Sequence, residues 1–192
     1  MRELEGRDCH PYATVKGKLA TSLLLLGVGS GISATVKAAE NNMRFHGALV
    51  AEPCVIPPGE ESITLDFGTV VDKYLYLNTR TVGQAFNIRL MNCDLSLGNI
   101  VSVTFSGMES IGLPGLLAVD TGSGAQGIAI GLETSEAKPV LLNKATDQFA
   151  LQAGNNLIAI RAYVQGEPEA IRTQGITRGA FTATATFSLS YE

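Results

Sequence analysis

The chain has 192 residues, of which 45% are hydrophobic and 17% are charged, and its formal net charge is −4. This length suits one domain of ordinary size preceded by a removable leader. The sequence has no basic run long enough to follow a phosphate backbone, so nucleic acid is not a predicted partner. Tryptophan is absent and aromatic residues make up 6%, so we expect a core built mainly from aliphatic side chains and Phe.

The first 39 residues have the order of a secretory signal peptide, which is basic, then apolar, then small. Lys16 and Lys18 precede an apolar run over residues 19–32, and small residues follow it. This run is short for a membrane-spanning helix and contains three glycines, although a single membrane anchor is the alternative. We therefore predict cleavage after Ala38 or Ala39.

Two of the three cysteines follow the predicted leader. Cys9 would be removed with the leader, which leaves Cys54 and Cys93. An even pair of cysteines in an exported chain predicts a disulfide, with two free thiols as the alternative. No C-x-x-C motif accompanies the pair, so we expect a structural bridge.

The hydrophobic pattern after the leader has a period of two, which is typical of half-buried strands. Apolar and polar residues alternate in short runs bounded by Gly, Asn, Asp or Pro. The expected strands cover residues 63–67, 86–90, 101–105, 128–130 and 158–164. No window favours an amphipathic helix. Many short strands in a chain of this size predict an all-β fold, a β-sandwich.

The clearest expected strand is the last one. Its apolar face carries Phe181, Ala183, Ala185, Phe187, Leu189 and Tyr191. A slip of one residue would turn this whole face to solvent, so the register is strongly specified. An immunoglobulin-type sandwich has one more strand after this position, and without that strand the outer edge would stay open to strand addition. An ordinary edge strand of a complete sandwich is the alternative.

A second strand pattern lies before the first retained cysteine. Met43, Phe45, Gly47 and Leu49 share one face of this segment. A neighbouring molecule could use such a segment to fill an open groove, which would contribute about 1.5–3 kcal/mol for each buried apolar side chain. Gly47 would suit a close approach to the core of the acceptor, because it has no Cβ.

These segments together resemble a known family. The pieces that carry the resemblance are Phe45-x-Gly47 before Pro53-Cys54, and residues 86–93, 101–107, 113–115, 127–130, 168–172 and 183–187, with Tyr191 next to last. In this order and behind a signal peptide, the chain resembles minor pilins of the chaperone–usher pathway, in particular the adaptor subunits of P and type 1 pili. The resemblance covers essentially the whole chain after the leader.

The resemblance implies an incomplete immunoglobulin-like β-sandwich that lacks its C-terminal, seventh strand and is completed by donor-strand complementation. It divides the chain into a signal peptide (1–39), a donor-strand extension (40–53) and a pilin domain (54–192). The implied partners are a periplasmic chaperone, an outer-membrane usher and adjacent pilin subunits, and the implied location is a fimbria at the cell surface. Gly179 matches a glycine of the family, and the carboxylate of Glu192 would be anchored in the chaperone cleft.

No residue set predicts an enzyme, a cofactor, a metal site or a small-molecule substrate. His46 lies on the polar face of the proposed donor strand, and the carboxylates Glu60, Glu61 and Asp66 are expected to be loop charges rather than a catalytic pair. The alternatives to an adaptor are a terminator subunit, a sugar-binding tip adhesin and, more distantly, a secreted hydrolase. About fifteen residues separate the cleavage site from Cys54, which leaves no room for the lectin domain of a tip adhesin.

Overall fold

A computed structural model describes residues 45–47, 49 and 51–192. The predicted leader and Met43 lie outside the described residues. The chain divides into residues 1–47 and a larger compact unit, residues 48–192, which contains all the secondary structure described below. No helix within the described part of the chain is long and apolar enough to span a membrane.

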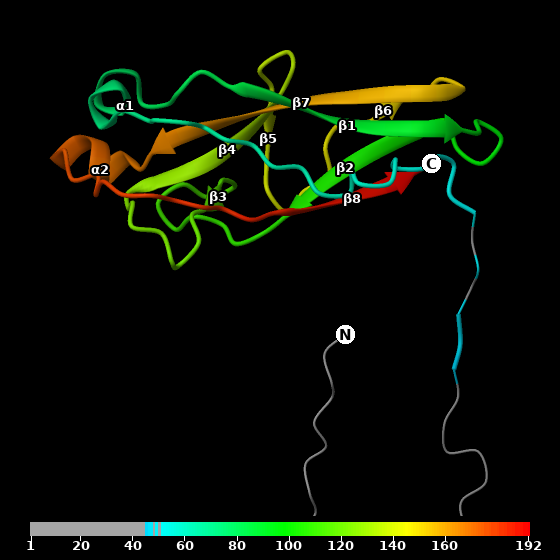
Figure 1. Cartoon of the computed structure of the whole chain (residues 1–192), viewed down its shortest axis with the longest axis horizontal. Coiled ribbons are helices and arrows are strands. Elements are labelled where there is room, and N and C mark those ends of the chain that lie inside the picture. Colours follow the sequence, from blue (N-terminus) through cyan, green and yellow to red (C-terminus); the bar gives the residue numbers. More distant parts are fainter. Residues whose placement is uncertain (1–44, 48, 50) are drawn as a thin grey trace, which may run out of the picture. The chain divides into compact units, whose positions relative to one another are not determined.

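The larger unit is built from two antiparallel β-sheets with two short helices at one end (Figure 1). The first sheet has the order β1 (Gln84–Cys93), β7 (Gly154–Gly166), β4 (Ile128–Thr134), β3 (Leu117–Ala118), with β5 (Pro139–Val140) also paired to β4. The second sheet has the order β6 (Phe149–Ala150), β2 (Ile100–Ser106), β8 (Thr186–Tyr191). The helices are α1 (Asp72–Asn78) and α2 (Pro168–Thr173).

The core lies between the inner faces of the two sheets, as expected for a sandwich. Phe86 of β1 and Phe105 of β2 meet edge to face, with ring centroids 6.2 Å apart. The alternation of buried and exposed residues predicted from the sequence is present along β2, where Val101 and Val103 are fully buried. Strands at 86–90, 101–105, 128–130 and 158–164 are thus confirmed, within β1, β2, β4 and β7.

Residues 63–67 were expected to form a strand, and this prediction is wrong. No ladder partner is described for this segment, although Leu65 and Phe67 pack against the core. The alternating pattern correctly indicates which side chains face the core. A strand also needs a hydrogen-bonded neighbour, which the pattern does not reveal. The last predicted strand is likewise shorter than expected. It begins at Thr186, because Ala180 and Thr182 accept hydrogen bonds from the loop N–H groups of Gly124 and Asp120 instead.

The two helices were not expected, since each is too short to show a 3.6-residue period. The only buried side chain of α1 is that of Leu75, and Thr79, which follows the helix, has a φ of 66°. Pro168 occupies the start of α2, where its missing N–H costs nothing, and Gln174 ends the helix in the left-handed conformation. Tertiary packing rather than local propensity stabilises such short helices.

The predicted disulfide between Cys54 and Cys93 is confirmed. Both cysteines are buried, and the bridge fixes the start of residues 54–70 to the end of β1. Beside the bridge, Val55 and Met91 exchange backbone hydrogen bonds of 2.9 and 2.8 Å. The disulfide therefore anchors one end of residues 54–70, the segment that lies across from β8.

An ion pair with a buried carboxylate joins the first sheet to the chain that follows α1. The Arg80 guanidinium donates to the Glu133 carboxylate at 2.7 Å and lies 4.2 Å from the centre of the Tyr163 ring. Hydrogen bonding to Glu133 is the main cause that raises the pKa of Arg80 above its ordinary value. The pairing satisfies a carboxylate that would otherwise be buried at high cost.

Candidate functional site

The outer edge of β8 is the candidate functional site. On its inner edge β8 pairs with β2, and Glu192 exchanges backbone hydrogen bonds with Ile100 just past the end of the strand. Because bonded and non-bonded pairs alternate in an antiparallel ladder, the next bonded residues are Ser190, Ser188 and Thr186. The N–H and C=O groups of the intervening residues, which are Phe187, Leu189 and Tyr191, point toward the outer edge. No strand pairs with that edge among the described residues.

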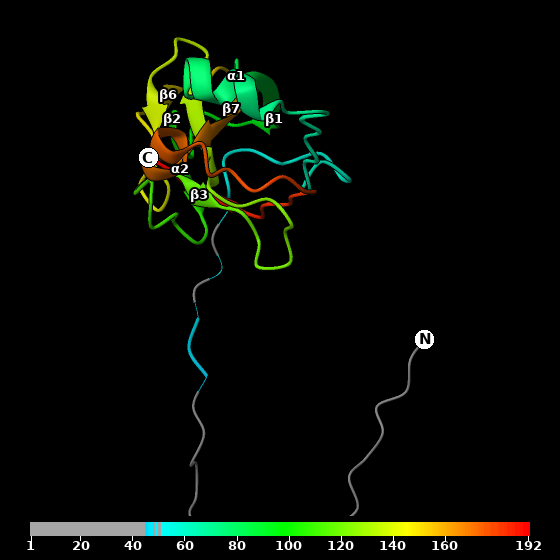
Figure 2. The same cartoon turned by 90° about the vertical axis from the view of Figure 1, so that its left-hand side faces the viewer.

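The segment 56–70 forms the opposite rim. It runs beside residues 177–191 in two perpendicular views (Figures 1 and 2). Leu65, Phe67 and Val70 pack against the core from this rim. Within the described part of the chain, no backbone hydrogen bond joins 61–70 to any other segment. Two unpaired stretches of backbone therefore face each other across the apolar interior.

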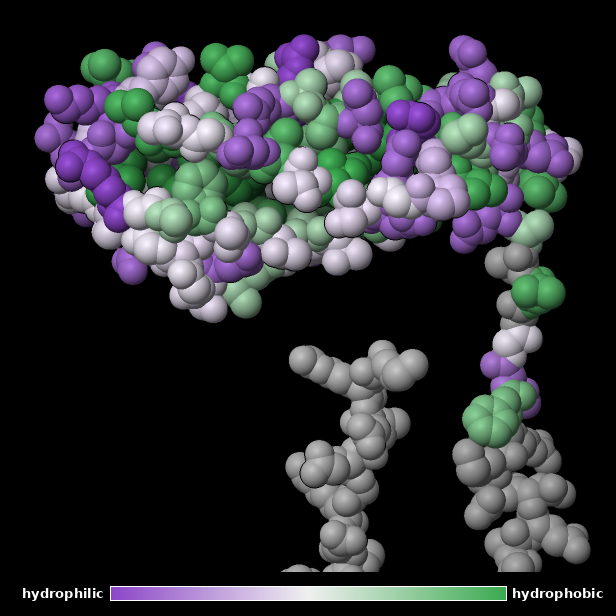
Figure 3. All heavy atoms as spheres, in the orientation of Figure 1, coloured by the Kyte–Doolittle hydropathy of each residue, from purple (hydrophilic) through white to green (hydrophobic). Residues whose placement is uncertain are grey.

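The burial of registered partners shows that the core is uncovered on this side. Tyr191, Leu189 and Phe187 lie opposite Val101, Val103 and Phe105 in the β2–β8 ladder. The three β2 side chains are 0%, 0% and 4% exposed, whereas their partners on β8 are only half-buried. Figure 3 shows hydrophobic residues recessed between more polar rims along this face. We call this feature, bounded by 56–70 and 179–191, the groove.

The groove is closed at the end near α1 and α2. The rings of Phe67 and Phe181, one from each rim, are 6.2 Å apart. Beyond them the Arg178 guanidinium donates to the Asp72 carboxylate at 2.7 Å, and this bond lowers the pKa of Asp72. The N–H of Ile176 also donates to the Tyr76 hydroxyl at 3.2 Å. The Phe67–Phe181 contact joins the two rims, and the other two contacts join α1 to residues 176–178 just beyond it. Together they set the limit of the groove.

Comparisons with known proteins identify the family to which the chain belongs. A family model described as "Fimbrial protein" matches residues 43–192. The chain belongs to the fimbrial protein family of chaperone–usher pilins. An uncharacterized fimbrial-like protein, YfcP of Escherichia coli K12, is 34% identical over 88% of this chain and 93% of its own. The fimbrial adapter PapK of Escherichia coli is also 34% identical, over 81% of this chain and 90% of its own.

Solved structures agree with this assignment. The crystal structure of the P pilus rod subunit PapA matches with a TM-score of 0.63 and 25% identity, over 73% of this chain and all of that one. The predicted fold class is thereby confirmed: this pilin has the all-β, immunoglobulin-like sandwich that lacks its last strand. The uncovered edge of β8 is where that strand is missing.

The residues predicted for the apolar face of the last strand do not all behave alike. Phe181, Ala183, Phe187, Leu189 and Tyr191 are half-buried and pack against the core, whereas Ala185 is exposed. Burial raises the pKa of the Tyr191 hydroxyl, and the nearby Glu52 carboxylate raises it further. The side chain of Glu192 accepts a hydrogen bond from the Gln148 amide at 2.9 Å.

The residues predicted for the donor strand are exposed where the structure describes them. The side chains of Phe45 and Leu49 are 85% and 104% exposed, and no atom lies within 4 Å of the Cβ position of Gly47. Of the polar residues weighed for catalysis, His46 is exposed and Glu60 pairs with Arg89 at 3.3 Å. Glu61 and Asp66 accept hydrogen bonds from the N–H groups of Gly59 and Gly68 in local turns. No group of three possible metal ligands occurs among the described residues.

The structure explains why a glycine occupies position 179, which the sequence alone did not. A Cβ on Gly179 would lie 2.6 Å from the carbonyl carbon of Gly124 and 2.9 Å from the amide nitrogen of Ala125. Both are backbone atoms, so they cannot rotate away. The glycine lets the groove rim pass directly over the 120–125 loop and so positions the chain that leads into β8.

Gly179→Ala is therefore expected to destabilise the domain by about 1–3 kcal/mol through overpacking. Chemical denaturation followed by circular dichroism measures this loss. Gly122→Ala is the matched control from the same loop, because no atom lies within 4 Å of its Cβ position. Equal stability of the two variants would contradict this role for Gly179.

Sequence reasoning missed the residues that close the groove. Phe67 was assigned to a strand, and neither Asp72 nor Arg178 was singled out. Asp72 and Arg178 are 106 residues apart, and no periodic pattern connects two side chains over such a distance. The alternation of Leu65 and Phe67 was a usable signal that this segment faces the core, even though it forms no strand.

Proposed function

We propose that this pilin is an adaptor subunit of a fimbria, joined to its neighbours by donor-strand exchange. The observation that carries the proposal is the half-buried apolar face of β8 beside a second rim without a ladder partner. A strand placed between the two rims would bond to both and cover the core. The similarity to the adapter PapK supports the adaptor role in particular.

The partners follow from the same edge. A periplasmic chaperone would lend a strand beside Thr186–Tyr191, and an outer-membrane usher would exchange it for the extension of the next subunit. Residues 1–39 would be a signal peptide removed after Ala38 or Ala39, residues 40–53 the extension, and residues 54–192 the pilin domain. Met43, Phe45 and Leu49 would be the apolar anchors of the extension, and Gly47 its point of closest approach. In this proposal the role is structural and non-catalytic.

A terminator subunit is the second candidate, and the closed end of the groove favours it. The Phe67–Phe181 contact and the Asp72–Arg178 pair shorten the space that an incoming strand can use. An adaptor accepts a strand along residues 181–191 despite these contacts, whereas a terminator accepts none. Binding of a synthetic donor peptide to the chaperone-released subunit separates the two.

Deletion of residues 40–50 tests the proposed function. The shortened pilin is expected to bind its chaperone and to accept a donor strand as before, because its groove is unchanged. It is expected to lose the ability to complete a preceding subunit, since the anchors at 43, 45 and 49 are gone. Co-purification with the chaperone and incorporation into fimbriae measure the two properties. Normal incorporation of the shortened chain would exclude the proposed role of the extension.

A further inference from the structure

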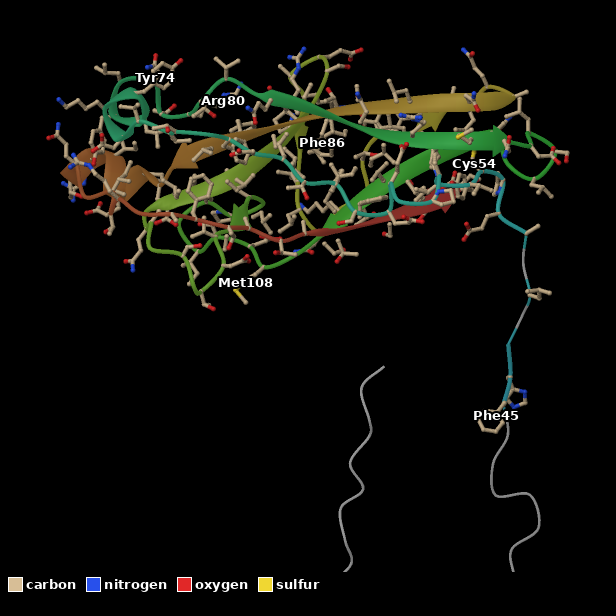
Figure 4. All side chains as sticks on the ribbon, in the orientation of Figure 1. Phe45, Cys54, Tyr74, Arg80, Phe86 and Met108 are labelled. Atoms are coloured by element: carbon tan, nitrogen blue, oxygen red, sulfur yellow. A yellow bond between two sulfur atoms is a disulfide. The ribbon has the colours of Figure 1, made fainter. Side chains whose placement is uncertain are left out.

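The end of the domain formed by α1 and the chain after it carries exposed apolar side chains beside the closed end of the groove. Val71, Tyr74 and Leu77 lie along one side of α1, and Val82 follows the helix. Leu77 and Val82 are 85% and 79% exposed, and Tyr74 and Val82 line the same shallow hollow above Glu133. Figure 4 places Tyr74 and Arg80 at this end. We call these four residues the α1 surface.

The opposite end of the domain carries a second exposed apolar set. Leu95 and Leu97 lie in the loop between β1 and β2, and Val55 follows Cys54. Pro53 and the backbone of Glu192 both lie against Gly98 of this loop, so the loop and the point from which the extension leaves form one end. Figure 4 labels Cys54 there, across the length of β1 from Tyr74. We call Val55, Leu95 and Leu97 the Cys54 surface.

We propose that the α1 surface of this pilin binds the Cys54 surface of a second copy of this pilin, the copy whose extension fills its groove. The inference rests on the proposed function and adds an interface to it. The direction of the incoming strand decides which two surfaces meet. β8 runs from the α2 end toward the Cys54 end, and a strand antiparallel to β8 runs the other way. The body of the donating subunit then follows at the α1 end of the acceptor.

The opposite direction would bring two like ends together. A strand parallel to β8 would leave the groove at the Cys54 end of the acceptor, where the acceptor's own extension departs. The incoming strand and the acceptor's own extension would then compete for the same space. A contact between two like ends could also not repeat from one subunit to the next. A contact between unlike ends is heterologous and propagates into a fibre. The apolar α1 and Cys54 surfaces are the unlike ends that such a contact brings together.

Charge is consistent with this pairing. Glu52, Asp94 and Glu192 surround the Cys54 surface, and hydrogen bonds from Ser96 lower the pKa of Asp94, which keeps it ionised. On the other side, the exposed Lys73 lies on α1 next to Tyr74. An acidic end would thus meet an end that offers a cation beside its apolar residues, which favours the oriented approach.

A comparison of two probes tests the interface. The first probe is a synthetic peptide of residues 40–53, and the second is a second copy of the mature chain that carries the same residues. Each probe is bound to the full-length mature pilin. Its dissociation rate is then measured by competition with a labelled copy of the peptide. Leu77→Glu and Val82→Glu in the acceptor are expected to speed dissociation of the whole-subunit probe about tenfold each, while the peptide dissociates as before. Leu157→Glu is the control, because Leu157 is exposed on β7 away from the α1 surface.

A compensating substitution in the donating copy gives a second test of the contact between the α1 and Cys54 surfaces. Leu97→Lys in the donating copy is expected to recover part of the affinity lost in the Leu77→Glu acceptor, because the new charges would meet. Unchanged dissociation of the whole subunit from both α1-surface variants, with peptide binding intact, would overturn this interface and leave the groove assignment standing. Failure of both probes to bind the unsubstituted pilin would overturn the proposed function, and the interface with it.

Discussion

Replacement of Leu189 by Asp is expected to abolish strand acceptance by this pilin. Leu189 lies opposite the fully buried Val103 and is only half-buried without a donor strand. An added strand would complete its burial, which is worth about 1.5–3 kcal/mol for a side chain of this size. A carboxylate at the same position would lose this gain and would also have to be desolvated. We therefore expect donor-peptide affinity to fall at least 100-fold, as measured by fluorescence anisotropy.

The adjacent residue supplies the control. Ser190 belongs to the same strand but is exposed, and its backbone bonds to β2 rather than to the outer edge. Ser190→Asp introduces the same charge on the other face and is expected to change the peptide affinity less than threefold. Similar losses in the two variants would contradict a strand that binds at the outer edge of β8 and packs against its apolar face.

Loss of the disulfide is the second large effect that we expect. The bridge closes a loop in which Cys54 and Cys93 are 39 residues apart, which corresponds to about 4 kcal/mol of chain entropy in the unfolded state. The paired variant Cys54→Ser with Cys93→Ser should therefore melt about 10 °C or more below the native protein. It should also accept a donor strand poorly, because the rim at 56–70 loses its anchor beside Met91. Differential scanning calorimetry measures the first effect.

Reduction provides the matched comparison for the disulfide. A reducing agent should lower the melting temperature of the native chain toward that of the serine variant and leave the variant itself unchanged. A native chain that melts at the same temperature in both conditions would show that the bridge does not support the fold.

The sequence was most informative where one physical pattern decided the outcome. The alternation from Phe181 to Tyr191 predicted a strand with one apolar face, and the structure forms its last part as β8, with Phe187, Leu189 and Tyr191 packed against the core. The even pair Cys54 and Cys93, left after the predicted leader of an exported chain, predicted the disulfide. Both predictions depend on residue types and their order, which can be read from a single sequence.

The sequence was least informative where a neighbour decided the outcome. Residues 63–67 alternate as clearly as β2 does, but the structure describes no ladder partner for them. Gly179 looked like a family signature, and its physical role depends on the distant backbone of Gly124. Likewise, the pair formed by Asp72 and Arg178 exists only because the fold brings α1 beside the chain that follows α2. Such contacts between distant segments have no period in the sequence.

Amide hydrogen exchange along β8 tests the open outer edge most directly. The backbone N–H groups of Phe187, Leu189 and Tyr191 are expected to exchange quickly in the monomeric pilin, whereas those of Ser188 and Ser190 are held by β2. Addition of a donor peptide should slow the first three by several orders of magnitude and leave the other two little changed. Slow exchange at all five positions before any peptide is added would mean that the edge is already paired, and would contradict this account.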